Sequence, residues 1–392
     1  MIEISNLRKY VNGETVRLEA DIKFLNMTSI CPAKTIYFEI AKEQSFLFSA
    51  NTYDAFVLVG LYLAMCNHTD LRIRGNISKK LYKNLTWYVQ KILCDFSGVL
   101  TPAKIFVESF TTPTPVGNVI GTGISCGVDS LSTLYERFIK EDDPDYKINA
   151  LFIFNCGSHG DFDWEHTQTL FKSRVKRAFA LADELDLPVV AVDTNLHQFR
   201  NEENKDVILH LAFYSCVLGM QNGIRRYYVP STCSYEEIKR YGKEYKDLAG
   251  FADSYLIPLI QTEQTELIID GCQYRRVDKI KKIADWDIAQ KYLNVCLSQK
   301  SADSANCGHC SKCLRTLLTI EILGKLENFA KVFDIEAYKD EALNYKVECL
   351  LNADKKIFHQ ENIALAKEMN FPMPLKRTCY VLDNHFMIVE GK

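Results

Sequence analysis

Strands and helices alternate in regular order along the middle of the chain, and this order constrains the fold most. Four apolar stretches have strand length, namely Val119–Ile124, Ala150–Phe154, Pro188–Val192 and Tyr227–Val229. Stretches with helix length and helical apolar spacing separate them, namely Leu131–Lys140, Trp164–Leu185 and Val207–Met220. Such alternation requires right-handed crossovers. The sequence therefore predicts an α/β fold with a parallel sheet covered by helices on both faces, and ligands bound beyond the carboxyl ends of the strands.

The N-terminal part of the chain has a different pattern and is predicted to form a separate α+β domain. A strand is expected at Lys34–Ile40 and helices at Tyr53–Met65 and Lys80–Phe96, while Thr111–Pro115 has the composition of a linker. The predicted boundaries are 1–115 for this domain, 116–295 for an ATP-binding domain, 296–325 for a zinc-binding segment and 326–392 for a helical and extended C-terminal region.

Composition limits the function classes. The chain has 47 Lys and Arg against 50 Asp and Glu, so no basic excess points to nucleic-acid packaging. The N-terminus lacks a signal-peptide pattern, and the longest apolar run, Ala55–Met65, is far shorter than the roughly 20 residues that span a bilayer. We therefore expect a cytoplasmic protein with no membrane contact, whose 14 cysteines are reduced and mostly packed as small apolar residues.

A short polar loop follows the first strand and stands directly before a predicted helix. It reads Ser125, Cys126, Gly127, Val128, Asp129 and Ser130. Small residues in such a turn let backbone N–H groups converge on a phosphate, and the two serines add hydroxyl donors. Asp129 can accept from neighbouring N–H groups or help hold a metal. No Walker-type loop occurs in the sequence, so the loop predicts phosphate binding of another type, with an ordinary helix N-cap as the alternative.

Four cysteines near residue 300 have the spacing of a metal site. They are Cys296, Cys307, Cys310 and Cys313. The short spacings let thiolates converge from one tight turn, and four thiolates form a closed tetrahedral site that suits structural Zn²⁺. An iron–sulfur cluster is the alternative. His309, inside the turn, is expected to face solvent.

The polar loop resembles that of the PP-loop ATP pyrophosphatase superfamily, which reads Ser-Gly-Gly-x-Asp-Ser after the first strand. Four fixed positions match, and Cys126 stands where the family usually has glycine. With the four cysteines and Arg315 two positions beyond them, residues 117–320 resemble the 7-cyano-7-deazaguanine synthase (QueC) family. The resemblance implies a Rossmann-like fold of the adenine nucleotide alpha hydrolase type, with ATP and Mg²⁺ as cofactors and Zn²⁺ as a structural ion.

The resemblance also implies roles for individual residues. The catalytic residues would be Asp129, Ser130 and Lys279. The ATP-binding residues would be Ser125, Cys126, Gly127, Val128, Asp129, Ser130, Asn155, Gly157, His159 and Arg276. Lys279 and Arg276 come from a basic segment that matches the family loosely, and an exposed basic helix face is the alternative for them. Asp193–Asn195, at the end of the third strand, could touch the adenosine or form an Asx turn.

The implied activity is an ATP-dependent ligase or synthase that forms a C–N bond. It would adenylate a carboxylate or amide, such as a 7-deazaguanine derivative, with release of AMP and pyrophosphate. Residues 1–115 suggest a larger acceptor or a protein partner, and a homodimer is expected. Two alternatives stay open: a tRNA sulfur-transfer enzyme that uses Cys126 or Cys156, and a nucleotide-binding module without turnover. Lys79, Lys80, Tyr82 and Lys83 leave RNA contact open, although a basic helix face is usually only solvated.

Overall fold

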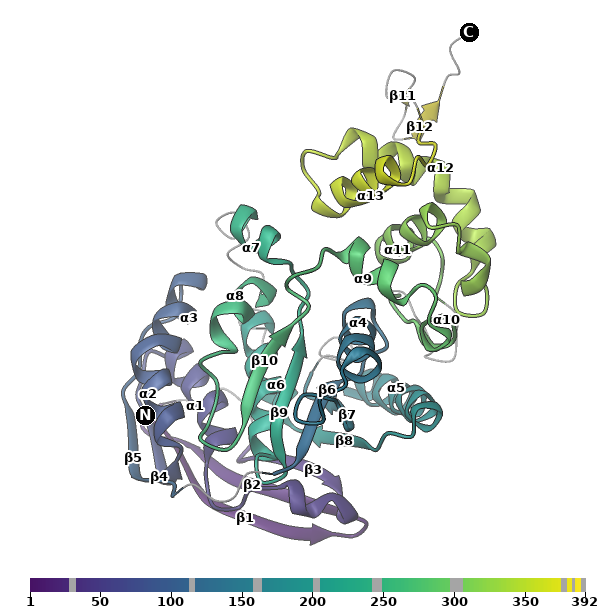
Figure 1. The fold of residues 1–392 in the computed structure, drawn as a ribbon. Coiled ribbons are helices and arrows are strands. Elements are labelled where there is room, and N and C mark those ends of the chain that lie inside the picture. Colours follow the sequence, from purple (N-terminus) through teal and green to yellow (C-terminus); the bar gives the residue numbers. More distant parts are fainter. Residues whose placement is uncertain are drawn as a thin grey trace. The chain divides into compact units, whose positions relative to one another are not determined.

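In the computed structural model the chain folds into two compact units (Figure 1). The first unit contains residues 1–123, 137–231 and 240–270, and the second contains 124–136, 232–239 and 271–392. The structure describes residues 1–27, 33–112, 117–157, 164–199, 205–241, 249–296, 306–374, 379–382 and 385–388.

A ten-stranded sheet forms the first unit. From one edge to the other its strands are β10 (Glu266–Asp270), β9 (Ile224–Pro230), β6 (Val119–Gly123), β7 (Ala150–Asn155), β8 (Val189–Thr194), β3 (Thr35–Ala41), β2 (Thr15–Phe24), β1 (Ile2–Asn12), β4 (Leu71–Ile77) and β5 (Ile105–Phe110). Six of its nine strand pairs are parallel, and the other three, β1–β2, β2–β3 and β3–β8, are antiparallel. The predicted α/β class with a mostly parallel sheet is therefore confirmed.

The parallel half of the sheet is built from the strands that the sequence predicts. β6 pairs with β7 on one side and with β9 on the other, and all six residues of β7 are buried. A buried parallel strand carries side chains on both faces, which explains its continuous apolar sequence. A methyl group at Gly121 would lie 2.2 Å from the Phe152 ring, so only glycine allows this close packing of β6 on β7.

Residues 1–115 do not form a sheet of their own, which corrects the predicted separate domain. β3 pairs with β8, bringing Phe38 opposite Thr194. The Asn195 side chain closes the same junction, since it accepts the Tyr37 N–H at 3.0 Å and donates to the Thr35 carbonyl at 2.7 Å. Pairing between strands so far apart in sequence leaves no signal in local periodicity. The proposed linker falls partly outside the described residues, in 113–116.

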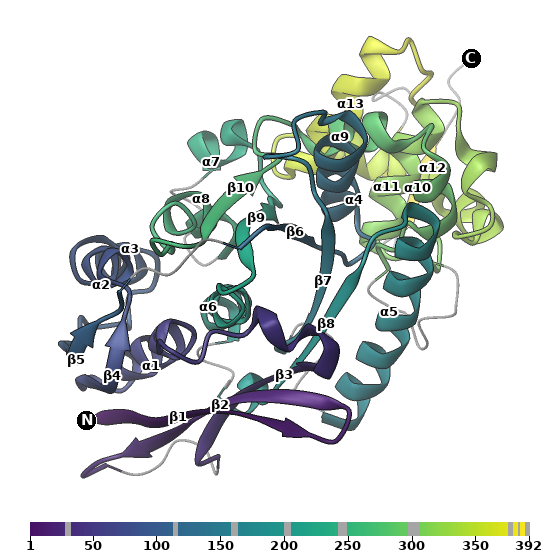
Figure 2. The same ribbon diagram turned by 60° about the horizontal axis from the view of Figure 1, so that its bottom comes forward.

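Helices cover both faces of this sheet (Figure 2). The helices of the first unit are α1 (Asp54–Cys66), α2 (Lys79–Asn84), the π-helical segment Leu85–Val89, α3 (Gln90–Phe96), α5 (Trp164–Leu185), α6 (Lys205–Gly219) and α8 (Ala249–Leu256), with two 3-10 turns at Lys42–Leu47 and Leu196–Phe199. α1 packs on α6, and both join the buried apolar cluster of β1, β2 and β3. α5 packs on β7 and β8 from the opposite side of the sheet.

The second unit is mostly helical. Its elements are α4 (Val128–Leu134), α7 (Tyr235–Tyr241), α9 (Arg276–Ile283), α10 (Asp287–Tyr292), α11 (Ser311–Ile322), the 3-10 turn Leu326–Phe329, α12 (Ile335–Leu351), α13 (Ile357–Glu368) and a hairpin of β11 (Cys379–Leu382) and β12 (His385–Ile388). α4 continues as a π-helical segment, Tyr135–Lys140. α9 packs against α4, α11 and α13, with Val277, Leu318 and Leu365 in one buried cluster.

Within the described residues, we find no helix that combines the length and apolar character needed to cross a bilayer.

Candidate functional site

The polar loop closes on itself through its two serines. The Ser125 and Ser130 hydroxyl oxygens lie 3.2 Å apart, and the Ser130 hydroxyl donates to the Gly127 carbonyl at 3.1 Å. The Gly127 N–H donates weakly to Ser125 Oγ at 3.3 Å. α4 begins at Val128, so the loop and the first turn of the helix form one tight polar surface.

Cys126 occupies a backbone conformation that glycine normally supplies. Its φ is +58°, in the left-handed region, and its side chain is 2% exposed. A residue with a Cβ pays roughly 1–2 kcal/mol there. The Asn294 N–H holds this conformation by donating to the Cys126 carbonyl at 2.8 Å. The thiol is buried, as is the Val128 side chain, so each of these two predicted ligands could reach a nucleotide through its backbone only.

Asp129 is paired with two cations from α9. Its Oδ2 lies 2.9 Å from Arg276 Nη1, and its Oδ1 lies 3.0 Å from Lys279 Nζ. Burial alone would raise the pKa of the Asp129 carboxyl, but the charges of Arg276 and Lys279 outweigh it and lower the pKa below its usual value. Arg276 and Lys279, which the sequence suggested as phosphate contacts, therefore pair with the loop aspartate. The alternative was that both residues lie on an exposed helix face.

The local sequence of α9 explains how a lysine reaches the loop. Arg276 and Lys279 are three positions apart and so lie on one side of the helix. Arg275, the residue before α9, is fixed by Asp278, which accepts its backbone N–H and pairs with its guanidinium at 2.9 Å. Gly271 has φ +91°, and a methyl group there would lie 3.4 Å from Lys279 Nζ. Glycine thus leaves room for the buried ammonium group, which is on a side chain 2% exposed.

Two further cations extend this charge on α11. Burial lowers the pKa of Lys312 below its usual value, and the charges of Arg315 and Arg276 lower it further. Burial, with a contribution from Arg276, likewise lowers the pKa of Arg315 to about 10. Arg315 therefore stays cationic at neutral pH. The Phe358 ring of α13 stacks on Arg315, with the guanidinium carbon 4.0 Å from the ring centre.

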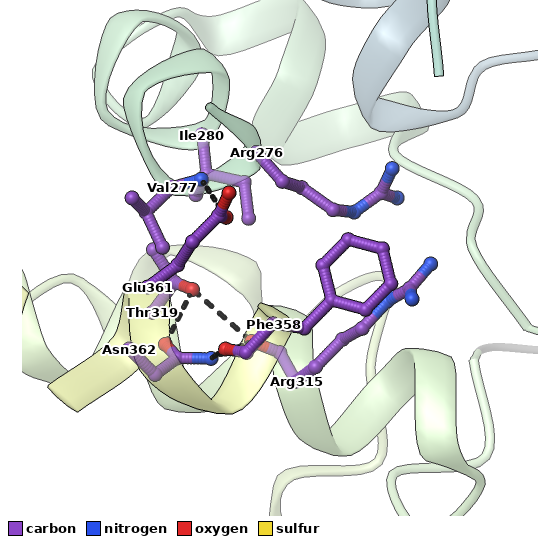
Figure 3. Close-up of a pocket in the computed structure, with 8 residues that line it drawn as sticks. All are labelled: Arg276, Val277, Ile280, Arg315, Thr319, Phe358, Glu361 and Asn362. Carbon is purple, nitrogen blue, oxygen red and sulfur yellow. Dashed lines mark hydrogen bonds between the residues drawn. The ribbon is translucent and has the colours of Figure 1, made fainter. Parts of the chain in front are cut away.

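A small cavity of about 10 Å³ lies between α9, α11 and α13 (Figure 3). It is lined by Arg276, Val277, Ile280, Arg315, Thr319, Phe358, Glu361 and Asn362. Three buried polar atoms around it have no hydrogen-bond partner: Nε of Arg276, Nε of Arg315 and Oε1 of Glu361. Figure 3 shows the two guanidinium groups turned to the same side. Burial raises the pKa of Glu361 to about 7. The cavity has room for about one water, so a larger ligand could bind only outside it.

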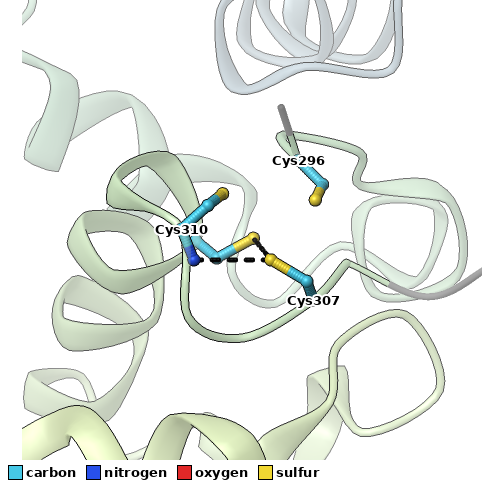
Figure 4. Close-up of side chains that lie close together, drawn as sticks. Cys296, Cys307 and Cys310 are labelled. Carbon is cyan, nitrogen blue, oxygen red and sulfur yellow. Dashed lines mark hydrogen bonds between the residues drawn. The ribbon is translucent and has the colours of Figure 1, made fainter. Parts of the chain in front are cut away.

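The four predicted cysteine ligands come together. The sulfur atoms of Cys296, Cys307, Cys310 and Cys313 all lie within 4.8 Å of one another, and Figure 4 shows three of them gathered at the turn before α11. The Cys307 and Cys313 sulfurs are 3.9 Å apart, and the Cys310 N–H donates to Cys307 Sγ at 3.4 Å. This donor set is able to hold a metal ion in a closed tetrahedral site.

Asn306 ties the two halves of this cluster together. Its Oδ1 accepts the N–H groups of Val295 and Cys296, at 2.8 and 2.9 Å. Its Nδ2 donates to the carbonyls of Leu293 and Val332, at 2.9 and 2.7 Å. All four bonds of a buried amide are satisfied, so Asn306 places Cys296 against the later three cysteines. Asn306 is not among the residues predicted from the sequence.

The turn between the cysteines depends on one glycine. Gly308 has φ +76°, and a methyl group there would lie 2.3 Å from the Asp334 carbonyl oxygen. The next residue, His309, is exposed and places its Nδ1 2.8 Å from the Cys307 carbonyl oxygen. This exposure confirms the expectation that His309 faces solvent.

The candidates from the ends of the second and third strands belong to the first unit. Asn155 Nδ2 donates to Asp193 Oδ1 at 2.7 Å, while the buried Asn155 Oδ1 has no partner. Burial raises the pKa of Asp193. Gly157 has φ +101°, which suits a tight turn after β7. His159 lies outside the described residues. The roles of Asn155, Gly157 and His159 in binding a nucleotide stay predictions.

Comparison with models of known protein families, with curated proteins and with solved structures finds no match for this chain. A function can therefore be inferred only from the residues of the site. Lys312 and Arg315 are the residues that the sequence analysis left without a role. Their spacing from Cys310 and Cys313 is the sequence signal that places both of them on α11, next to the cysteines.

Proposed function

We propose that this protein is an ATP-dependent enzyme of the ATP pyrophosphatase type, which adenylates a carboxylate or amide substrate. The observation that supports it is the excess of positive charge beside the serine loop. Arg276 and Lys279 share a single carboxylate, Asp129, and the buried Nε of Arg276 has no partner. A phosphate chain would supply further negative charge to these two cations.

In this function the chain mainly positions the substrates and neutralises the negative charge of the phosphates. A substrate carboxylate oxygen attacks the α-phosphorus of ATP, the bond to the β-phosphate breaks, and pyrophosphate leaves. An amine then attacks the activated carbon, forms the C–N bond and releases AMP. Arg276 and Lys279 offset the negative charge of the leaving pyrophosphate, the Ser125 and Ser130 hydroxyls hold phosphate oxygens, and Asp129 fixes the two cations.

The identity of the substrate follows from the family resemblance alone. A carboxylated 7-deazaguanine is the acceptor that the resemblance favours, with transfer of the deazaguanine to a protein as its extension. Both oxygens of Asp129 are in ion pairs with cations, and no second carboxylate joins the described residues of the loop. This donor set does not fit a Mg²⁺ held by protein carboxylates. Magnesium would enter on the phosphate oxygens of ATP.

We propose Zn²⁺ as the ion of the four-cysteine site. Four thiolates complete a tetrahedral shell and leave no position for water, so the ion would be structural. Metal analysis of the purified protein should give one zinc per chain. Iron with a brown colour would contradict this assignment and favour a cluster.

The test of the activity is a product assay. The purified chain is incubated with ATP, Mg²⁺, ammonia and candidate carboxylates, and nucleotides are separated by chromatography. We expect AMP and pyrophosphate in equal amounts. Lys279→Gln should lower the rate at least 100-fold because it removes charge at the leaving group. Lys281→Gln is the matched control, since Lys281 lies on the same helix but is about half exposed and paired with Glu368.

Two outcomes would contradict the proposal. ADP as the sole product would exclude cleavage at the α-phosphate. Binding of ATP without cleavage in the presence of every substrate would favour a nucleotide-binding module. The sulfur-transfer alternative has little support, because a persulfide carrier needs an accessible thiol and Cys126 and Cys156 are 2% and 0% exposed.

A further inference from the structure

Two pairs of cations, one on α9 and one on α11, lie in the second unit. Arg276 and Lys279 of α9 pair with Asp129, and Arg315 of α11 lines the same cavity as Arg276. Lys312 is three positions before Arg315 and so lies on the same side of α11. Among the described residues, Lys312 and Arg315 form no ion pair with a carboxylate of their own. These four cations outnumber the carboxylates that the structure places beside them, Asp129 and Glu361.

Buried like charges repel strongly, and a chain holds them together at a cost unless a ligand balances them. The Arg276 side chain is only 10% exposed, yet its Nε has no partner, and the same holds for the Nε of Arg315. Figure 3 shows their guanidinium groups directed to the same side of α9 and α11. The terminal N–H groups of two neighbouring guanidinium groups match the oxygens of a phosphoanhydride.

Arg315 is also held rigidly from behind. Phe358 stacks on its guanidinium, and the Asn362 amide donates to its backbone carbonyl at 3.4 Å. Thr319 Oγ1 donates to the same carbonyl at 3.1 Å. A side chain fixed in this way loses little conformational freedom when it binds an anion.

The metal site fixes the start of the same helix. Cys310 is the residue before α11, Lys312 lies between Cys310 and Cys313, and Arg315 follows two positions later. A metal that binds these cysteines therefore sets the position of both cations. Without it, only the turn around Gly308 and the packing of α11 would place them.

We propose that Lys312 and Arg315 join Arg276 and Lys279 in one binding site for a phosphoanhydride, and that the four-cysteine metal site sets the affinity of that site. The inference rests on the proposed function, since the ligand is the phosphate chain of ATP or the pyrophosphate it releases. It assigns to the metal a second task besides stabilising the fold. It also makes binding of the metal and of the anion reciprocal.

The first test measures binding of inorganic pyrophosphate by calorimetry to the metal-loaded full chain. Lys312→Gln and Arg315→Gln should each weaken binding at least 5-fold, and the double variant at least 50-fold. Lys367→Gln is the matched control, because Lys367 is an exposed lysine of α13 and should leave affinity unchanged. Arg315→Lys keeps the charge and should recover part of the loss, which separates charge from packing.

The outcomes distinguish the inference from the function it rests on. If the wild-type chain does not bind pyrophosphate, the phosphate site and the inference both fail. If the wild-type chain binds and the variants at Lys312 and Arg315 bind as tightly as Lys367→Gln, the inference alone fails. Thermal melting of each variant with and without metal shows whether a loss of binding reflects a loss of folding.

The second test measures the coupling. The rate of metal release to a chromophoric chelator is followed with and without saturating pyrophosphate. Pyrophosphate should slow release from the wild-type chain at least 5-fold and have no such effect in the Lys312→Gln/Arg315→Gln double variant. That variant, at the same pyrophosphate concentration, corrects for metal bound by pyrophosphate itself. If pyrophosphate changes the rate of metal release by the same factor in the wild type and in the double variant, the proposed coupling is wrong.

Discussion

Two aspartates, one in each unit, are surrounded by different kinds of partners. Asp54, at the start of α1, is 1% exposed and is bound by neutral donors: the Ser78 N–H at 2.7 Å and the Gln221 amide at 2.8 Å. Burial raises its pKa to about 6. Asp129 is bound by two cations, and its pKa is lowered although burial opposes this. The pKa of an aspartate is thus raised at one of these positions and lowered at the other.

In the proposed function, this difference separates a carboxylate with a structural role from one that belongs to a binding site. At Asp54 the donors only satisfy the carboxylate, and no ion pair forms there among the described residues, so the group ties α1 to residues near β4 and α6. At Asp129 two cations pair with one carboxylate, and in the proposed function these cations also bind a phosphate chain. The three predictions below test this contrast in decreasing order of size.

The largest effect should come from matched amide substitutions. Asp129→Asn leaves Arg276 and Lys279 without a counter-charge and should lower the free energy of local opening at α4 by about 2–4 kcal/mol. Asp54→Asn should leave the opening of α1 unchanged or make it less favourable, since the buried Gln221 Oε1 has no partner and can accept the new amide N–H. Native-state hydrogen exchange of the two helices measures both changes. Equal losses at both sites would remove the contrast.

The second effect is a pH dependence with a defined sign. The folded pKa of Asp54, about 6, lies above the unfolded value, so its contribution to stability falls as pH rises from about 4 to 6. A shift of this size corresponds to roughly 2–3 kcal/mol. Over this pH range the stability of the Asp54→Asn variant should therefore increase relative to that of the wild type. Asp129 has the opposite sign, so its stabilisation is present at neutral pH and is lost only as pH falls through its lowered pKa.

Hydrogen exchange of α1 in the wild type and in Asp54→Asn at pH 4, 5, 6 and 7 measures the pH dependence that Asp54 causes. The same measurement at α4, with Asp129→Asn as the reference, gives the pH dependence that Asp129 causes. A wild-type α1 that becomes more stable between pH 4 and 6, relative to Asp54→Asn, would show that the carboxylate is stabilised as an ion at this site.

Sequence reasoning was most successful where the signal is local. The strand at β6 and the bounds of α5 follow from runs of apolar residues and helical spacing, and the four cysteines follow from spacing alone. Lys279 was selected from a loosely matching segment, and the structure pairs it with the loop aspartate. Its role in binding phosphate stays a prediction.

What sequence reasoning missed depends on contacts between distant segments. The pairing of β3 with β8 joins residues about 155 positions apart, so no window on the sequence could show that the N-terminal strands continue the central sheet. Arg315 gains its environment from α9 and α13, and Asn306 gains its role from bonds to Leu293 and Val332. Each of these roles exists only after the chain has folded.

The smallest effect concerns the loop that carries Asp129. Cys126 has φ +58° where glycine would be unstrained, and it also buries a thiol. A comparison of Cys126→Gly with Cys126→Ala separates the two terms, because both variants lose the thiol and only alanine keeps a Cβ. The glycine variant should be the more stable by about 1 kcal/mol.

The usual order is the reverse, since glycine costs about 1 kcal/mol relative to alanine inside a helix. Cys216, a buried residue of α6, provides the control: there the alanine variant should be the more stable. Thermal melting of the four variants measures both differences. If alanine is favoured at position 126 as well, the left-handed turn is not maintained in solution. The close approach of the Asn294 N–H to the Cys126 carbonyl would then be lost, and with it the backbone that presents Asp129 to its two cations.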